Sequence, residues 1–474
     1  MPFSMDDTIT ATATAPGRGA IGVVRISGPS AWNIGLAIFR SKSGGLKRIK
    51  PRYLYYGHVV NPANSEQLDE ALAVFFRGPH TYTAEDMIEI QSHGSPLILR
   101  RITELALAQG ARSAEPGEFT LRAFLNGRID LAQAEAIADL VSSSSDAAIR
   151  QSLHQLEGTL SRQTKLANDA ILRAMAPIEA SIDFPEEEVP PVERRNIQQL
   201  IQSAQSIAAE LLSGAERGRI AREGISCVIA GRPNAGKSSL FNALLQMDRA
   251  IVTAMAGTTR DTLEETALLG GVAVRLTDTA GITEIASDEA EAIGVQRSKT
   301  ALDNAEIAIL VIDSSLALCE EDTTAAHMLA EKGYGAARRP IIAALNKADM
   351  PHAVTAAALR SMLDAAGVQP FTIIETSAVE KTGLRELETA ITQAALGDQF
   401  AEHAPIVARA RHRDALLRAS EALAEAQQTL ISGAPLDFVA EDLREASARL
   451  SEITGFQVTE DLLTIIFRDF CIGK

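Results

Sequence analysis

Short apolar runs separated by turn residues fill the first part of the chain. Four of these runs, each rich in β-branched and aromatic residues, are residues 21–27, 53–60, 71–76 and 87–94. Gly, Pro and Asn lie between them, as is typical of strands joined by turns. The pattern predicts an α/β domain over residues 1–120.

A helical pattern follows, with apolar residues spaced three and four apart. It runs from about Leu121 to Gln205 and is rich in Ala, Leu and Gln, which favour helices. The segment from Asp183 to Pro191 interrupts it, and its prolines and acids predict a solvated loop between helices. Helical periodicity returns over residues 399–474.

Between these helical stretches, apolar runs alternate with helical patterns. The runs are residues 225–231, 273–281, 307–313, 340–349 and 371–378. Such runs, apolar on both faces, predict a parallel sheet covered by helices on both sides. We expect an α+β multidomain protein, in which an α/β domain at 223–398 is inserted into one helical domain formed by 121–222 and 399–474. Three consecutive domains are the alternative.

The charge balance limits the possible partners. The chain carries 45 Lys and Arg against 61 Asp and Glu, a net charge of −16. Nucleic acid would therefore need a local basic patch. The stretch from Arg40 to Arg52 holds six basic residues and no acid, and it is either a tRNA patch or simply an exposed loop.

Cysteine usage and the apolar runs indicate the compartment. The three cysteines are scattered and form no CxxC pair, which argues against a disulfide framework or a zinc site. The polar N-terminal segment does not resemble a secretory signal, and no apolar run is long enough to span a membrane. We expect a cytoplasmic protein that does not enter a membrane.

A phosphate-binding motif, GRPNAGKSS, occupies residues 231–239. It follows an apolar strand pattern and precedes a helical one, which is the context that GxxxxGK[ST] requires and that a chance Gly-rich turn would lack. Gly231 and Gly236 allow backbone N–H groups to point at a phosphate. Lys237 can reach the β- and γ-phosphate oxygens, and Ser238 can offer its hydroxyl to magnesium.

Three further motifs lie at the ends of later strand patterns. DTAG begins at Asp278, whose carboxylate can hold magnesium through water, and NKAD ends at Asp349, which can accept two hydrogen bonds from guanine. Adenine lacks that donor pair, so such a site rejects it by roughly 10⁴ or more. Thr376, Ser377 and Ala378 follow the next strand, where the Ala378 N–H can meet the guanine carbonyl oxygen. The order of the motifs predicts a Ras-like GTP-binding domain.

The loops around the nucleotide add further expectations. Asn346 can bridge base and loop, and the Lys347 stem can cover the base face. GTTRD, residues 257–261, suits a switch loop that closes on magnesium, with Thr259 as the ligand. Ile282 stands where many small GTPases carry a water-orienting Gln, so hydrolysis needs another group. The acids of the following loop are candidates, or they form only a solvated acidic run.

Five segments, four of them outside the GTPase core, point to one family. They are TATAPGRGAIGVVRISG, PGEFTLRAFLNGRIDLAQAEAIADL, SIDFPEEE, DEAEAIG and the terminal FCIGK. Over essentially its whole length the chain resembles the MnmE (TrmE) tRNA-modification GTPases. The resemblance implies a homodimer formed through an N-terminal domain that binds 5-formyl-tetrahydrofolate or a related folate. It also implies a complex with the FAD-dependent MnmG protein, a heterotetramer, that adds a carboxymethylaminomethyl or aminomethyl group to the wobble uridine of certain tRNAs.

The resemblance also implies residue roles. The folate residues are Arg25, Glu89, Arg128 and Lys474. Arg128 stands where lysine is common, and Arg25 could instead be a charge at a strand edge. The potassium residues are Asn234, Thr253, Met255 and Thr258, and the magnesium ligands are Ser238 and Thr259. The catalytic residues are Glu291 and Lys237.

The complete GTP-binding set expected from motifs and resemblance follows the order of the chain. It is Asn234, Ala235, Gly236, Lys237, Ser238, Ser239, Thr253, Ala254, Met255, Ala256, Gly257, Thr258, Thr259, Asp278, Thr279, Ala280, Gly281, Asn346, Lys347, Ala348, Asp349, Ser377, Ala378 and Val379. Cys471 is either a nucleophile toward uridine or a plain thiol.

Two other functions share the four GTP motifs. One is a ribosome-assembly GTPase switch without modification chemistry, and the other is a GTP-dependent scaffold that only positions a partner. Ribosome-assembly GTPases generally carry a basic RNA-binding module, whereas this chain is acidic. The sequence favours a GTPase whose cycle drives tRNA modification.

Overall fold

The structure of the chain is a computed structural model. It describes residues 6–42, 49–183, 193–247, 264–278, 302–335, 339–397, 407–456, 460–468, 470 and 473. The chain divides into two compact units, Met1–Ala138 with Ser447–Lys474, and Asp139–Ala446. Within the described residues, no helix is long and apolar enough to cross a membrane.

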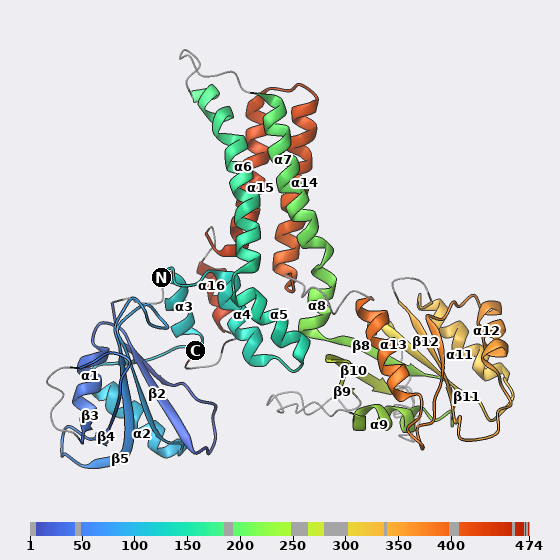
Figure 1. The fold of residues 1–474 in the computed structure, drawn as a ribbon, viewed down its shortest axis with the longest axis horizontal. Coiled ribbons are helices and arrows are strands. Elements are labelled where there is room, and N and C mark those ends of the chain that lie inside the picture. Colours follow the sequence, from blue (N-terminus) through green and yellow to red (C-terminus); the bar gives the residue numbers. More distant parts are fainter. Residues whose placement is uncertain are drawn as a thin grey trace, which may run out of the picture. The chain divides into compact units, whose positions relative to one another are not determined.

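A seven-stranded sheet forms the centre of the first unit. Its strands are β1 (Ile9–Thr12), β2 (Ile21–Ser27), β3 (Phe39–Ser41), β4 (Leu54–Val60), β5 (Gln67–Phe76), β6 (Met87–His93) and β7 (Arg112–Ser113), in the order β3-β4-β5-β6-β2-β1-β7. The four apolar runs noted in the sequence become β2, β4, β5 and β6. α1 (Ala31–Ile38) and α2 (Pro96–Ala108) cover one face of this sheet (Figure 1), where Ile26, Phe75 and Ile90 share a buried apolar cluster.

Helices from both ends of the chain complete the first unit. They are α3 (Glu118–Leu125), the first turns of α4 (Leu131–Ser142), the end of α15 (Leu436–Thr454) and α16 (Glu460–Arg468). Leu121, Leu131 and Phe467 pack in one cluster. Gly455 has a φ of +90°, and a Cβ there would lie 2.9 Å from Leu131, so this close approach requires glycine. The C-terminal segment is therefore an integral part of the N-terminal unit.

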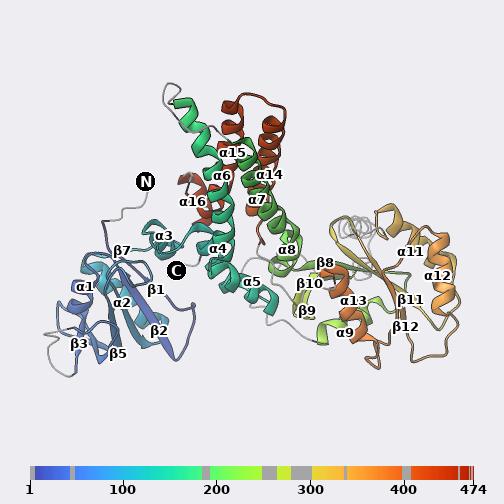
Figure 2. The same cartoon turned by 45° about the horizontal axis from the view of Figure 1, so that its top comes forward.

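Long helices make up one part of the second unit. They are α5 (Asp146–Leu156), α6 (Thr159–Asp183), α7 (Arg194–Ser213), α8 (Ala215–Glu223), α14 (Ala410–Ile431) and the part of α15 up to Ala446. α6, α7 and α14 lie side by side (Figures 1 and 2). Helices that precede and follow the α/β region thus pack together. The solvated loop expected at Asp183 to Pro191 lies outside the described residues except for Asp183, which ends α6.

One carboxylate joins the segments that lead into and out of the α/β region. Asp139 of α4 accepts hydrogen bonds from Arg222 of α8 at 2.9 Å and from Arg409 at 2.8 and 3.0 Å. Its side chain is only 8% exposed, and buried charges are stable only when they are paired in this way. The bidentate contact with Arg409 fixes the chain at the start of α14 against the end of α8.

The α/β region contains a six-stranded sheet. Its strands are β8 (Ile225–Ala230), β9 (Glu264–Leu269), β10 (Val272–Asp278), β11 (Ile307–Asp313), β12 (Ile341–Asn346) and β13 (Thr372–Glu375), in the order β13-β12-β11-β8-β10-β9. The expected parallel sheet is present, but β9 is an added edge strand antiparallel to β10. The two glycines between them, Gly270 and Gly271, both have positive φ, the conformation that a two-residue hairpin needs.

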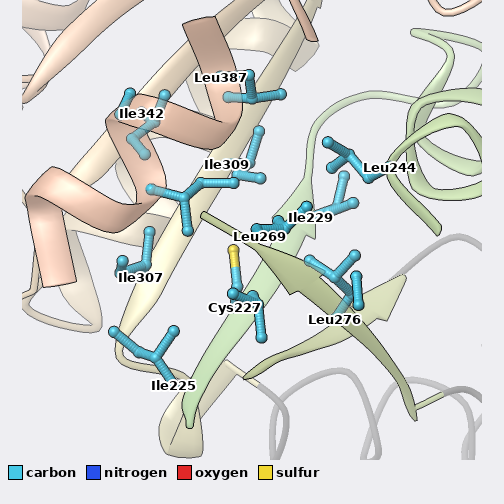
Figure 3. Packing of buried hydrophobic residues seen from close by; sticks show 14 of the residues in the cluster. Ile225, Cys227, Ile229, Leu244, Leu269, Leu276, Ile307, Ile309, Ile342 and Leu387 are labelled. Atoms are coloured by element: carbon cyan, nitrogen blue, oxygen red, sulfur yellow. The ribbon is translucent and has the colours of Figure 1, made fainter. Parts of the chain in front are cut away.

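Helices cover both faces of this sheet, as the doubly apolar runs predict. They are α9 (Lys237–Met247) and α13 (Leu384–Leu396) on one face, and α11 (Glu320–Glu331) and α12 (Ala356–Ala365) on the other. Figure 3 shows the first core, where Cys227 and Ile229 of β8 lie with Leu244 and Leu387 of the covering helices. Burial raises the pKa of the Cys227 thiol, so this cysteine serves as a small core residue.

Candidate functional site

The phosphate-binding motif lies at the carboxyl end of the central strand. β8 ends at Ala230, and α9 begins at Lys237 after the loop. The neighbours of β8 in the sheet are β10 on one side and β11 on the other. Ligands of open α/β sheets bind outside the carboxyl ends of strands where the connections diverge in this way. The topology therefore places the motif where a nucleotide site is expected.

Glycine is needed at two positions of this loop. Gly231 has a φ of +147°, and a Cβ there would lie 2.3 Å from the carbonyl oxygen of Val311. Gly236 has a φ of +95°, and its Cβ would lie 2.2 Å from Nδ2 of Asn346. Asn234 also has a left-handed backbone, with a φ of +61°, which Asn tolerates better than most residues. These conformations wrap the loop around one point.

The ammonium group of Lys237, which the motif predicts at the phosphates, lies within the loop. Lys237 is 7% exposed, and its Nζ donates to the carbonyl oxygens of Gly231 at 2.9 Å and Arg232 at 2.8 Å. The ammonium group therefore lies inside the curve of the loop, where phosphate oxygens would be alternative acceptors. Ser239 follows in α9, on its exposed side.

The hydroxyl and carboxylate expected at magnesium lie together. Ser238 Oγ donates to Oδ2 of Asp278, the last residue of β10, at 2.6 Å. Among the described residues, no group of three or more His, Cys, Asp or Glu side chains could hold a metal ion.

The guanine motif contacts the phosphate loop directly. Asn346 Nδ2 donates to the carbonyl oxygen of Ala235 at 3.0 Å in a fully buried contact. Lys347 has a φ of +63°, and its Nζ lies 2.6 Å from Oδ2 of Asp313. Burial alone would raise the pKa of Asp313, but hydrogen bonds from Lys347 and Ser315 outweigh burial and hold that pKa below its usual range. A charged carboxylate therefore orients the Lys347 stem.

The last motif closes on the same site. Ser377 Oγ donates to Oδ1 of Asp349 at 2.5 Å, and the Ala348 N–H donates to the carbonyl oxygen of Thr376 at 3.0 Å. Asp349 is exposed to solvent, so its carboxylate is accessible to a base. Ala378 and Val379 follow directly, and Val379 is 81% exposed. The structure thus gathers the first, third and fourth motifs and the Asp278 end of the second.

Several expected residues lie outside the described part of the chain. They are Thr253 to Thr259 of the switch loop, Thr279, Ala280 and Gly281 of the second motif, Ile282 and the acidic loop with Glu291, and the terminal Cys471 and Lys474.

Two contacts at this site were not expected from the sequence. Arg232 of the phosphate loop lies 3.3 Å from Oδ1 of the buried Asp322 and 3.2 Å from Sγ of Cys319, both at the start of α11. The second is the contact between Asp313 and Lys347. The position of Asp313 at the end of an apolar strand, level with Asn346 in the register, was a usable signal for it. No comparable signal marks Cys319 or Asp322, because their contact with Arg232 depends on helix placement.

A second candidate site lies on the face of the first sheet that α1 and α2 do not cover. Arg25 of β2 and Glu89 of β6 are level in the register and form an ion pair of 2.8 Å. β2 lies between β6 and β1, so Arg25 is not at a strand edge. The Arg25 guanidinium also lies 5.0 Å from the ring centroid of Tyr82 and 3.4 Å from the carbonyl oxygen of Gly473. Gly473 therefore lies at this site.

A cavity of about 520 Å³ adjoins the ion pair. It is lined by Arg52, Phe76, Pro79, His80, Thr81, Tyr82, Met87, Glu89 and Arg128. The Arg128 guanidinium lies 5.1 Å from the centroid of the Tyr82 ring and donates to the carbonyl oxygen of Tyr82. Two of the four expected folate residues, Arg25 and Arg128, thus contact Tyr82, which sequence reasoning missed. A third, Glu89, lines the same cavity.

The loop that carries Tyr82 is held by α3 and the residue that follows it. Tyr82 and Thr120 share a hydrogen bond of 2.8 Å, and Asn126 Nδ2 donates to the carbonyl oxygen of Thr83 at 2.7 Å. The Arg122 side chain, 1% exposed, pairs with Glu85 of the same loop at 3.2 Å. These contacts fix one wall of the cavity.

Comparison with known proteins matches two successive parts of the chain to described families. The family described as "MnmE helical domain" matches residues 131–471, and the family described as "GTP-binding protein TrmE N-terminus" matches residues 8–128. A protein of Alkaliphilus metalliredigens named "tRNA modification GTPase MnmE" is 44% identical over 475 residues, covering 99% of this chain and 100% of its own length. A protein of the same name from a Roseiflexus species is 46% identical over 472 residues, covering 99% of each chain.

Proposed function

The chain belongs to the MnmE family of tRNA modification GTPases, and from that membership we propose how its residues serve GTP hydrolysis and tRNA modification. The observation that carries the GTPase assignment is the direct contact between the phosphate loop and the guanine motif, Asn346 to Ala235. Lys237 binds the β- and γ-phosphates. Ser238 and Thr259 are the magnesium ligands, and the Asp278 carboxylate holds the ion through water. When bound, the ion neutralises phosphate charge.

Catalysis requires a group that positions the attacking water. Ile282 cannot do so, and we assign this role to Glu291, which acts through a bridging water as general base or as water positioner. Glu291→Ala should lower GTP turnover by about 10²-fold, the share typical of positioned acid–base catalysis, with nucleotide affinity nearly unchanged. Turnover measured by phosphate release, beside titration with a fluorescent nucleotide, checks this. If Glu284→Ala is impaired and Glu291→Ala is not, the assignment within this loop is wrong.

The modification itself takes place on tRNA. We propose that the chain acts as a homodimer with the FAD-dependent MnmG protein and adds a carboxymethylaminomethyl or aminomethyl group to wobble uridines. Mass spectrometry of tRNA from a strain lacking this chain should find those groups missing. They should return with the wild-type chain and stay absent with Glu291→Ala. Fully modified uridines in the deletion strain, together with defective ribosomes, would indicate a ribosome-assembly GTPase instead.

The cavity beside Glu89 is proposed to bind 5-formyl-tetrahydrofolate or a related folate. Support comes from its mixed chemistry, since the Glu89 carboxylate suits the donors of a pterin and the Arg128 guanidinium suits a glutamate tail. Arg25 orients Glu89 through their ion pair. Lys474, which directly follows Gly473, completes the set. This ligand size also suits a pocket of several hundred Å³.

Glu89→Gln should weaken folate binding by about 10- to 100-fold, because a neutral amide replaces a charged acceptor. Isothermal calorimetry on the full-length chain measures this change. Glu104→Gln is the matched control, since Glu104 forms only an exposed pair with Arg100 on α2, and it should leave the affinity unchanged. A thermal melt of each variant separates lost binding from lost folding. Equal folate affinity of the wild type and a folded Glu89→Gln variant would rule out this site.

A further inference from the structure

The cavity of the first unit has another cation, Arg52, with no role in the site proposed so far. Its guanidinium donates to the carbonyl oxygen of His80 at 2.6 Å, and both residues line the cavity. Arg52 and Arg128 are exposed, whereas the Glu89 side chain is 18% exposed. The cavity therefore has an acid on its buried side and two arginines on its exposed side.

The sheet register orders these groups along one face. Met87 precedes Glu89 by two residues in β6, so both side chains point to the same face about 7 Å apart, and Met87 is level with Phe76 of β5. Arg52 lies on the other side of β5 from Met87, because its N–H donates to the carbonyl oxygen of Phe75 at 2.8 Å. A ligand lying along the cavity would pass from Glu89 over Met87 and Phe76 to Arg52.

Resting on the folate site proposed above, we propose that Arg52 binds carboxylates of the folate's glutamate tail and makes the site prefer folates with several γ-linked glutamates. A folate carries its donor-bearing pterin and its anionic tail at opposite ends, in the same order as the acid and the arginines of the cavity. Each added glutamate brings a further carboxylate, and guanidinium binds carboxylates in bidentate pairs. Arg52 therefore has a carboxylate of its own to bind only when the tail carries more than one glutamate.

Calorimetry with the full-length chain tests the proposal, using 5-formyl-tetrahydrofolate with one and with five glutamates. The wild type should bind the pentaglutamate about 10-fold more tightly. In Arg52→Gln this ratio should fall to about 1 while the monoglutamate affinity changes by less than about 3-fold. Glutamine suits the comparison because Arg52 has a φ of +59°, and glutamine, like arginine an unbranched residue with a Cβ, carries about the same backbone cost there. Arg100→Gln on α2, where the arginine is 72% exposed, should keep the wild-type ratio.

The outcomes separate this inference from the folate site itself. Equal affinity of the wild type for both folates overturns the inference and leaves the folate site standing, whereas no folate binding at all overturns both. A ratio that persists in Arg52→Gln but falls in Arg128→Gln assigns the tail to Arg128 alone. If Arg52→Gln weakens tRNA binding and leaves the folate ratio intact, Arg52 belongs to a tRNA surface in the basic stretch 40–52, and the inference fails.

Discussion

Asp349→Asn should weaken GTP binding by several kcal/mol, about 10³-fold or more. Guanine presents two donors, N1–H and the exocyclic amine, to the carboxylate of Asp349. The substitution sets an amide donor against one of them and so loses a hydrogen bond while leaving a donor unpaired. Ser377 already donates to Oδ1 of Asp349 at 2.5 Å, so the carboxylate is held in one orientation before any nucleotide binds.

Titration with fluorescent nucleotides measures the effect, and xanthine nucleotides supply a second test. Xanthine carries a carbonyl oxygen where guanine carries the amine, so Asp349→Asn should bind xanthosine triphosphate better than the wild type does. Ser377→Ala should cost only about 3- to 10-fold in GTP affinity, because it removes an orienting bond and no base contact. Asp364→Asn, an exposed change on α12 of the same region, is the control. Wild-type GTP affinity in Asp349→Asn would refute the assignment.

The sequence predicts this region well, because its signals are local. Apolar runs on both faces of β11 and β12 require covering helices, and each GTP motif lies at a strand end, where parallel topology brings such ends together. The hairpin strand β9 was missed even though Gly270 and Gly271 are a typical hairpin signal. Its residues, EETALL, contain acids that weaken the strand pattern.

The contacts that the sequence does not reveal are those between distant elements. Arg232 of the phosphate loop contacts Asp322 only because α11 begins beside that loop, and Asp322 belongs to no motif. Tyr82 stands in a loop without periodicity, yet it contacts both Arg25 and Arg128. Gly473 contacts Arg25 although almost the whole sequence separates the two residues. Family resemblance pointed to the charged residues at the cavity, but only the register of β2 and β6 and the docking of α3 show what surrounds them.

Potassium should accelerate GTP hydrolysis by about 10²-fold over sodium, because fixed positive charge at developing phosphate charge is usually the largest catalytic contribution. An arginine finger often supplies that charge, and Arg260 of the switch loop is the competing candidate here. Asn234, however, stands in the phosphate loop with an exposed side chain whose oxygen can bind a monovalent cation. Carbonyl and hydroxyl oxygens from Thr253, Met255 and Thr258 would complete a cage that suits potassium better than the smaller sodium ion.

The backbone of Asn234 decides which variant tests this. Its φ of +61° lies in the left-handed region, so Asn234→Ala would add backbone strain to the loss of the oxygen. Asn234→Gly removes the same oxygen and accepts the conformation freely, so it is the cleaner variant.

Hydrolysis is compared in potassium and sodium chloride at matched ionic strength, with nucleotide affinity as the control. Asn234→Gly should lose the potassium effect and keep its GTP affinity within about 3-fold. Pairing of two of these GTP-binding regions should also lose its dependence on potassium, because the ion orders the switch loop that we expect to form their contact. Equal turnover of the wild type in both salts would refute the potassium site. Arg260 would then be the candidate that supplies the positive charge at the phosphates.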